Sequence, residues 1–322
     1  MANVTTFYAE TGDGKSNMQI SFVDQLIAKY PDAKVRLVAV DNIDVYQAYI
    51  DAGIIEYWPV ALWEYPFETL DYATRGFWPE DPMDPTSKIR PPTADTWKTV
   101  KLMICEGMSN FADLYMQRLG DIGGEGISIG PGTRANTKMA KANAKYGSGE
   151  EASDLINFMD GEYGVGGNSR SHYNIVQKAV RKNVLNTAVL PCRAHWTTLT
   201  CRATEQGKAI YGPLVVGNAA TPKVQQWCSS LIHLYADTKG SNSKYYMYFK
   251  DHVIQETGSL VWKSIQRVPL KVMDPKFKTK VQDQWDGIIP DKWEWTNDSQ
   301  IAEQFLELQR KMREAVTKLF TN

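Results

Sequence analysis

The stretch FYAETGDGKSNM, residues 7–18, decides the fold of this chain. It fits the pattern G-x-x-x-x-G-K-[ST], except that Ala9 stands where the first glycine is expected. In such a loop, small residues let backbone N–H groups point at phosphate oxygens, a lysine reaches the terminal phosphates, and a serine holds Mg²⁺. We therefore expect a phosphate-binding loop; the alternative is a plain strand-to-helix turn. The residues expected to contact the nucleotide are Ala9, Glu10, Thr11, Gly12, Asp13, Gly14, Lys15 and Ser16.

The segments around this loop have the order that a phosphate-binding loop requires. Residues 4–8 form a β-branched and aromatic run that predicts a strand, and a helical apolar spacing begins at Lys15 and ends before Pro31. Downstream, strand-like and helix-like segments alternate, which predicts an α/β fold with a mainly parallel central sheet flanked by helices. The predicted strands cover residues 34–41, 54–58 and 99–105, and the predicted helices cover residues 44–53 and 109–119.

The later part of the chain contains two segments expected to be irregular. Residues 64–97 are rich in Pro, Asp and aromatic residues, and residues 120–170 are rich in glycine. We divide the chain into a core, 1–270, and a C-terminal extension, 271–322. The other predicted elements are a helix at 173–183, strands at 184–191 and 229–235, and an antiparallel pair at a sheet edge formed by 244–249 and 260–268.

The last predicted element is an amphipathic helix at residues 298–320. Its apolar residues, from Ile301 to Leu319, recur at three- and four-residue steps. Such a helix either packs on its own core or pairs with another subunit. We favour packing on the core, because single amphipathic helices usually cover a domain.

A carboxylate is expected at the end of a strand near the loop, where it would help Ser16 to hold Mg²⁺. Glu106 follows the predicted strand at 99–105, and Asp41 ends the one at 34–41. In open α/β sheets, ligands bind at the carboxyl ends of the strands. We therefore predict Glu106 as the magnesium-side carboxylate and Asp41 as a nearby contributor; the alternative is that both are ordinary polar residues at strand ends.

The overall composition limits the classes of function. Charge is nearly balanced, with 36 Lys and Arg against 37 Asp and Glu, so binding to a nucleic acid would depend on a local basic patch. The four cysteines form no C-x-x-C pair, which argues against a disulfide scaffold or a structural zinc site. No apolar run approaches the roughly 20 residues that span a bilayer, and the first residues lack the pattern of a signal peptide. We expect a cytoplasmic protein that does not bind a membrane.

With these features in place, the chain resembles the RecA-type recombinase-core ATPases, most of all the compact phage-encoded members that act in single-strand annealing and recombination. The resemblance covers roughly residues 3–270, and it implies a RecA-like P-loop NTPase core that binds ATP and Mg²⁺. The segments that carry it, besides the loop, are LVAVDNIDVYQAYIDAGI (37–54), KLMICEG (101–107), TAVLPCRAHW (187–196) and TTLTCRATEQGKAIYGPLVVGNAATP (197–222).

The resemblance also implies roles for single residues. In the first of these segments the family has an acidic residue that activates water, but the matching position is Ile43, so this role falls to Asp44 or Glu106. The family usually has Asp where this chain has Glu106. His195 matches the polar residue at a strand end that senses the γ-phosphate, although a buried core histidine is the alternative. The segment 197–222 is similar to a mobile DNA-binding loop.

Three sets of basic residues are candidates for contacts with DNA or with a neighbouring subunit. In the first set, cations at steps of four, three and four form one stripe on a helix, which is either a DNA contact or a solvated face. The second set follows His195, and its alternative is ordinary surface charge. The third would reach the γ-phosphate of a neighbouring subunit, unless salt bridges account for it. The sets are Arg134, Lys138, Lys141 and Lys145; Arg202 and Lys208; and Lys263 and Arg267.

Together these features predict an ATP-binding, Mg²⁺-dependent, RecA-like ATPase that acts on single-stranded DNA and forms a homo-oligomer. The expected catalytic residues are Lys15, Glu106, Asp44 and His195. One alternative is a nucleotide-binding assembly or scaffolding protein with little turnover. A second alternative is a kinase of small molecules that uses the same loop.

Overall fold

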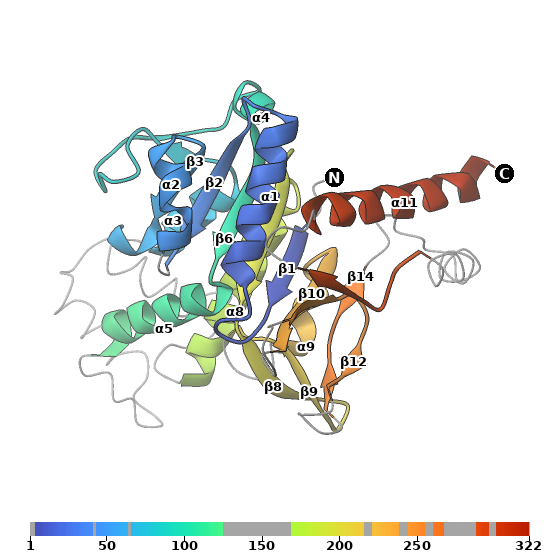
Figure 1. Cartoon of the computed structure of the whole chain (residues 1–322). Coiled ribbons are helices and arrows are strands. Elements are labelled where there is room, and N and C mark those ends of the chain that lie inside the picture. Colours follow the sequence, from blue (N-terminus) through green and yellow to red (C-terminus); the bar gives the residue numbers. More distant parts are fainter. Residues whose placement is uncertain are drawn as a thin grey trace, which may run out of the picture.

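A long β-sheet, most of whose strands are parallel, runs through the molecule (Figure 1). The computed structural model describes residues 4–40, 43–63, 66–124, 169–215, 221–237, 244–254, 260–266, 288–295 and 301–321. The strand order is β15-β11-β10-β1-β7-β6-β2-β3, and β14 also pairs with β10. These strands are β1 (Val4–Tyr8), β2 (Lys34–Ala39), β3 (Ile55–Pro59), β6 (Val100–Glu106), β7 (Arg193–Thr198), β10 (Ser230–Asp237), β11 (Lys244–Tyr248), β14 (Ile265–Gln266) and β15 (Lys292–Trp295).

The strands from β10 to β3 pair in parallel, whereas β11, β14 and β15 are antiparallel to their partners. All residues of β1 are buried, as are most residues of β2 and β6. Strands that are covered on both faces read as continuous apolar runs, which is why the sequence showed them clearly. The predicted fold class, α/β with a mainly parallel central sheet flanked by helices, is confirmed.

Helices cover both faces of this sheet. On one face, Phe22 of α1 and Phe305 of α11 pack against Phe7 of β1. On the other face, Phe111 of α5 and Val180 of α8 belong to a separate core cluster. The helices are α1 (Lys15–Lys29), η1 (Asp44–Tyr46), α2 (Gln47–Asp51), η2 (Val60–Leu62), α3 (Pro66–Thr74), α4 (Thr96–Thr99), α5 (Met108–Gly124), α8 (Ser169–Thr187), α9 (Thr221–Val224) and α11 (Ile301–Thr321).

Two smaller sheets accompany the central one. The first has the order β12-β13-β9-β8, and within it β8 and β9 form a hairpin. The two residues at the turn of this hairpin, Gln206 and Gly207, have φ values of 50° and 76°, as a two-residue type I′ turn requires. The remaining strands are β4 (Trp78–Pro79), β5 (Ile89–Arg90), β8 (Thr200–Glu205), β9 (Lys208–Pro213), β12 (His252–Val253) and β13 (Val261–Trp262).

The strand predicted at residues 184–191 is wrong. Residues up to Thr187 continue α8, and the strand that follows, β7, begins only at Arg193. Val184 is buried as part of the helix, while Val189 is 82% exposed in the turn. A short apolar run can belong to a buried strand or to one side of a helix, and its pattern does not separate the two.

The predicted antiparallel pair of residues 244–249 and 260–268 is also wrong. β11 pairs with β10 and β15 instead, while β13 joins the smaller sheet and β14 pairs with β10. Residues 64–97 contain more regular structure than predicted, namely α3, β4 and β5. Of the glycine-rich segment 120–170, residues 125–168 lie outside the described residues.

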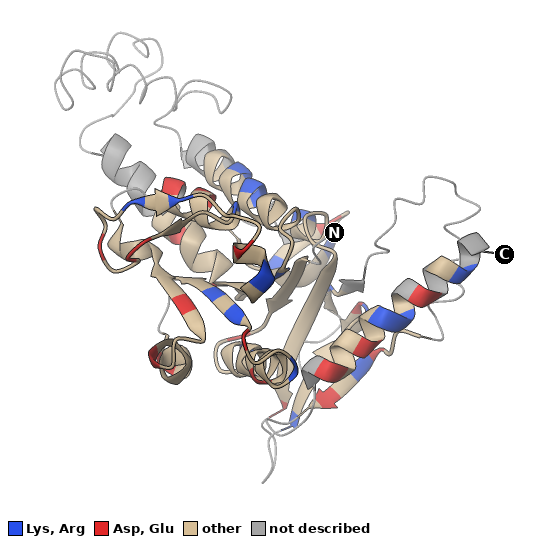
Figure 2. Cartoon of the chain, turned by 90° about the horizontal axis from the view of Figure 1, so that it is seen from above, with Lys and Arg blue, Asp and Glu red and all other residues tan. Residues whose placement is uncertain are grey.

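The C-terminal helix is confirmed and packs on its own core, as we favoured. α11 lies against α1, and its residues Phe305, Leu308 and Met312 are buried. Acidic and basic residues are interspersed along the helix (Figure 2). β15, from the predicted extension 271–322, belongs to the same sheet as the phosphate-loop strand β1. Among the described helices, none is both long and apolar enough to cross a membrane.

Candidate nucleotide site

The predicted phosphate loop lies between the end of β1 and the start of α1. Gly12 and Gly14 have φ values of 92° and 81°, in the left-handed region that favours glycine. A Cβ atom on Gly14 would also lie 3.1 Å from the ring of Trp295, so the ring would have to shift to accept a larger residue there. Ala9 has no positive φ, and its replacement of the first glycine of the motif therefore causes no backbone strain.

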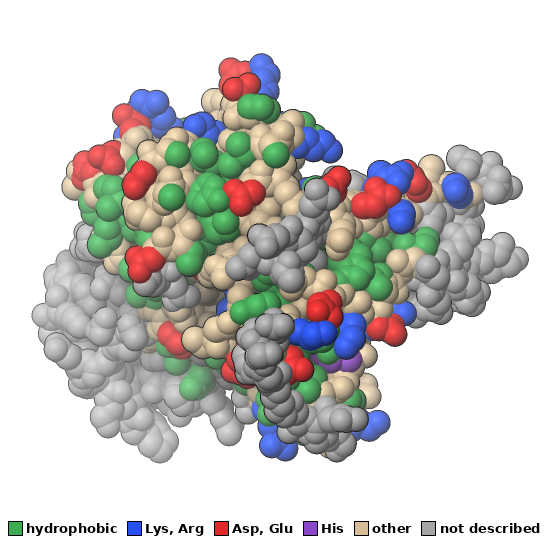
Figure 3. Space-filling view, viewed as in Figure 1, with side chains coloured by type: hydrophobic (Ala, Val, Ile, Leu, Met, Phe, Trp, Pro, Cys, Tyr) green, Lys and Arg blue, Asp and Glu red, His purple; other side chains and the backbone are tan. Residues whose placement is uncertain are grey.

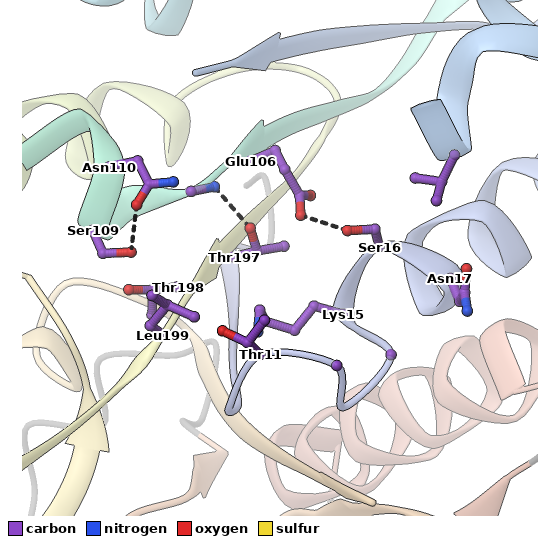
Figure 4. Close-up of a pocket in the computed structure, with 14 residues that line it drawn as sticks. Thr11, Lys15, Ser16, Asn17, Glu106, Ser109, Asn110, Thr197, Thr198 and Leu199 are labelled. Atoms are coloured by element: carbon purple, nitrogen blue, oxygen red, sulfur yellow. Dashed lines mark hydrogen bonds between the residues drawn. The ribbon is translucent and has the colours of Figure 1, made fainter. Parts of the chain in front are cut away.

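Lys15 and Ser16 begin α1 and face the two sides of the site (Figure 4). The Nζ of Lys15 donates hydrogen bonds to the carbonyl oxygens of Ala9 (3.1 Å) and Glu10 (2.7 Å). The Oγ of Ser16 donates to Oε1 of Glu106 over 2.8 Å. The structure therefore brings together the lysine, the serine and the acidic residue that the sequence predicted.

Glu106 ends β6 and is only 4% exposed. β7 lies between β6 and the loop strand β1, and the carboxyl ends of these three parallel strands meet at one edge of the sheet. Two hydroxyl groups bind the carboxylate, Ser16 at Oε1 and Tyr46 at Oε2, each at 2.8 Å. A buried carboxylate needs such donors, because unpaired burial of a charge is strongly unfavourable.

A cavity of ≈520 Å³ opens beside these residues. Its wall combines the phosphate loop, the turn from β6 into α5, and the end of β7 (Figure 4). The N-termini of α1 and α5 thus border one cavity, and helix N-termini favour anions such as phosphates. The lining residues are Thr11, Gly12, Gly14, Lys15, Ser16, Asn17, Val45, Glu106, Gly107, Ser109, Asn110, Thr197, Thr198 and Leu199.

Several polar residues of this wall were missed by the sequence analysis. Thr197 and Thr198 end β7, and the Oγ1 of Thr197 accepts a hydrogen bond of 2.8 Å from the backbone N–H of Gly107. Ser109 and Asn110 lie in the first turn of α5. The strand predicted at 184–191 ends several residues before the observed end of β7. A correct boundary would have identified Thr197 and Thr198 as the residues at the strand end.

His195 does not lie in this cavity, which corrects the prediction that it meets the γ-phosphate. It sits inside β7, 1% exposed, with its Nδ1 2.7 Å from Oε1 of Gln19 and its ring against Phe7 and Phe22. Burial lowers the pKa of His195 to about 3, so the ring is neutral at physiological pH. His195 is therefore a buried core histidine, which was the alternative to γ-phosphate sensing. Thr197 lies near the end of β7 instead.

This placement predicts how His195 affects stability as a function of pH. Its folded pKa of about 3 lies below the usual 6.5, so the unfolded chain binds the proton first as the pH falls. The stability contributed by the neutral ring is complete above pH 6.5 and is lost toward pH 3, at up to about 1.4 kcal/mol per pH unit. Urea unfolding from pH 7 to 4 should therefore show a shallower loss for His195→Gln than for the parent. Parallel curves for the two proteins would contradict this placement.

The other predicted acidic residues lie outside the cavity wall or outside the described part. Asp44 is exposed in η1, and its neighbour Val45 lines the cavity instead. Asp41 lies outside the described residues. Within the loop, burial raises the pKa of Asp13 to about 6, opposed by the charge of Lys15 and a backbone hydrogen bond from Glu10.

The second basic set, Arg202 and Lys208, lies on the β8–β9 hairpin rather than in an irregular loop. Both residues are exposed. Lys208 pairs across the hairpin with Glu205, so the alternation of side chains along a strand puts Arg202 on the opposite face. The hairpin is joined to the phosphate loop, because the hydroxyl of Thr200 donates to the carboxylate of Glu10.

The third basic set, Lys263 and Arg267, was predicted to reach the γ-phosphate of a neighbouring subunit. Lys263 forms ion pairs with Asp251 (3.0 Å) and Glu205 (3.1 Å), so the salt-bridge alternative applies to it. Arg267 lies outside the described residues, as do the four residues of the first set, Arg134, Lys138, Lys141 and Lys145.

Mg²⁺ fits the donors present beside Lys15. This ion takes hard oxygen ligands and usually binds through one or two carboxylates together with phosphate oxygens. The Ser16 hydroxyl donates a hydrogen bond to Glu106, which leaves the lone pairs of its oxygen available to a cation. Among the described residues, no group of three or more His, Cys, Asp or Glu side chains is arranged to hold a metal. Ser16 and Glu106 would supply two oxygen ligands, and phosphate oxygens of a bound nucleotide would supply others.

Comparisons with known proteins find similarity to solved structures. No protein-family model matches the chain, and no curated protein matches it. Among solved structures, a KaiC-like protein of Pyrococcus horikoshii is similar over 76% of this chain and 78% of its own, with 11% identity and a TM-score of 0.38. The flagellar accessory protein FlaH of Methanocaldococcus jannaschii is similar over 76% of both chains, with 9% identity and a TM-score of 0.32.

Proposed function

We propose that this chain is a Mg²⁺-dependent, RecA-like ATPase. The observation that carries the proposal is the convergence of Lys15, Ser16 and Glu106 on one cavity, where the Ser16–Glu106 hydrogen bond joins residues 90 positions apart. A plain strand-to-helix turn would not need a buried carboxylate beside its serine. The glycine conformations at positions 12 and 14 agree with a loop shaped around phosphates.

Each residue has a distinct role in the proposed reaction. Backbone N–H groups of residues 9–16 and the N-terminus of α1 would bind the phosphate oxygens. The Nζ of Lys15 would leave the carbonyls of Ala9 and Glu10 and bind the terminal phosphates. Ser16 and Glu106 would hold Mg²⁺, which neutralises phosphate charge when bound. Thr197 lies at the strand end between loop and carboxylate, where it can contact the γ-phosphate.

Single-stranded DNA is the partner that we propose, with the protein acting as a homo-oligomer in phage-type recombination or replication. On the face in Figure 3, acidic and basic side chains of the described residues are interspersed, so DNA binding would depend on local groups. Arg202 and Lys208 are such groups, because their hairpin is bonded to the phosphate loop through Thr200 and Glu10. Binding of nucleotide and of DNA could thereby affect each other.

The DNA proposal predicts a specific salt dependence. Single-stranded DNA should stimulate ATP hydrolysis by the parent, and Arg202→Ala and Lys208→Ala should each weaken DNA binding. Every phosphate contact that is lost should reduce the slope of log affinity against log salt by about 0.7. Fluorescence anisotropy with a labelled oligonucleotide at several salt concentrations measures this slope. Arg90→Ala, which removes an exposed arginine from the separate β4–β5 sheet, is the control and should leave the slope unchanged. Slopes for Arg202→Ala and Lys208→Ala equal to that of the parent would exclude these contacts.

A second candidate is a nucleotide-binding assembly or scaffolding protein with little turnover. It is favoured by one observation, namely that Glu106 is the only carboxylate among the described residues that line the cavity, and it is already bound by two hydroxyl groups. ATP binding without measurable hydrolysis, and without DNA affinity at low salt, would favour this candidate over the ATPase.

A further inference from the structure

Tyr46 is a buried residue beside the proposed metal site. It is fully buried at the end of η1, and its hydroxyl donates a hydrogen bond of 2.8 Å to Oε2 of Glu106. The other carboxylate oxygen, Oε1, accepts from Ser16 over the same distance. The carboxylate is thus held between α1 on one side and η1 on the other.

We propose that Tyr46 is a positioning residue that orients Glu106 toward the metal side of the nucleotide site, an inference that rests on the proposed function. A glutamate side chain has three rotatable bonds, and a single hydrogen bond does not fix the direction of its carboxylate. Donors at both oxygens do fix it. Ser16 binds Oε1 and Tyr46 binds Oε2, so loss of the Tyr46 hydroxyl removes one of the two hydrogen bonds that orient the carboxylate.

The chemistry of the donor matters as much as its position. A lysine or arginine at this place would also bind Oε2, but its charge would neutralise the carboxylate and weaken attraction for a cation. The tyrosine hydroxyl is neutral, so it satisfies a buried oxygen and leaves the negative charge of Glu106 in place. The pair therefore positions the carboxylate without adding a positive charge beside it.

Tyr46→Phe tests this role, because it removes one oxygen atom and keeps the ring. Binding of a fluorescent ATP analogue should be measured while Mg²⁺ is titrated. We expect the half-saturating Mg²⁺ concentration to rise by about tenfold, as is typical when an outer partner of a metal site is lost. Binding of the analogue in EDTA should stay within about twofold of the parent, since the phosphate loop is intact.

Tyr49→Phe is the matched control. Tyr49 lies three residues further along, and its hydroxyl donates to Oδ1 of Asp24 over 2.5 Å at the protein surface. This variant loses the same atom from the same segment, but it does not touch Glu106. Its Mg²⁺ midpoint should equal that of the parent. A midpoint for Tyr46→Phe that equals those of the parent and the control would overturn the inference.

A double-mutant cycle separates positioning from a general loss of structure. If Tyr46 acts through Glu106, then Tyr46→Phe should shift the Mg²⁺ midpoint in the parent but not in Glu106→Gln, where the charged carboxylate is gone. An equal shift in both backgrounds would contradict the inference. Failure of the proposed function gives a different result, because the parent itself would then show no Mg²⁺-dependent binding of the analogue.

Discussion

Replacing Lys15 with alanine is expected to abolish most of the proposed ATPase activity. Among the described residues that line the cavity, Lys15 is the only one with a positive charge. Its amine is bound to the carbonyl oxygens of Ala9 and Glu10 in the loop, and phosphates would replace these two partners. Loss of a donor aimed at developing charge typically reduces kcat by about 100-fold or more, and we expect at least this reduction for Lys15→Ala.

Lys29→Ala is the control for this experiment. Lys29 ends the same helix that Lys15 begins, and it is exposed at the far end from the cavity. Both variants lose one positive charge from α1, so a difference between them reports on position and not on net charge. Phosphate release should be measured at saturating Mg²⁺, together with binding of the ATP analogue. Hydrolysis by Lys15→Ala at the rate of the parent would show that the loop is not the nucleotide site.

Much of the fold could be predicted because its determinants are local. The buried strands β1, β2 and β6 are continuous apolar runs, and the loop between β1 and α1 has its own pattern of glycine, lysine and serine. Segments without such a pattern were predicted less well. Residues 184–191 are apolar because one side of the end of α8 is buried, and only the three-dimensional structure distinguishes this from a strand.

Some residues of the candidate site could be predicted from the sequence, and others could not. Glu106 could be paired with Ser16 in advance, because the carboxyl ends of neighbouring parallel strands meet at one edge of a sheet. Tyr46 could not, since its contact depends on how η1 folds back over β6. Lys263 could not be assigned either, because its ion-pair partners Asp251 and Glu205 are 12 and 58 positions away and belong to different strands or turns.

The amphipathic C-terminal helix could be predicted only in part. Its apolar stripe was evident from the sequence, whereas the surface that it covers was not. In the structure, the ring of Phe305 contacts those of Phe7, Phe22 and Phe249, with centroids 5.7–6.2 Å apart. These contacts join the last helix to the strand that leads into the phosphate loop. α11 is therefore expected to stabilise the part of the chain that holds the proposed nucleotide site.

Phe305→Ala should consequently destabilise the protein strongly. Phe305 is fully buried, and truncation of a buried phenylalanine typically costs about 3–5 kcal/mol in the free energy of unfolding. Leu306→Ala is the control, because the neighbouring side chain is only partly buried, and a loss of about 1 kcal/mol is expected there. Urea unfolding of both variants measures the difference. A helix packed on its own core cannot lose this ring without loss of stability. If Phe305→Ala instead kept its stability and changed the oligomeric state, that result would show that α11 pairs with another subunit.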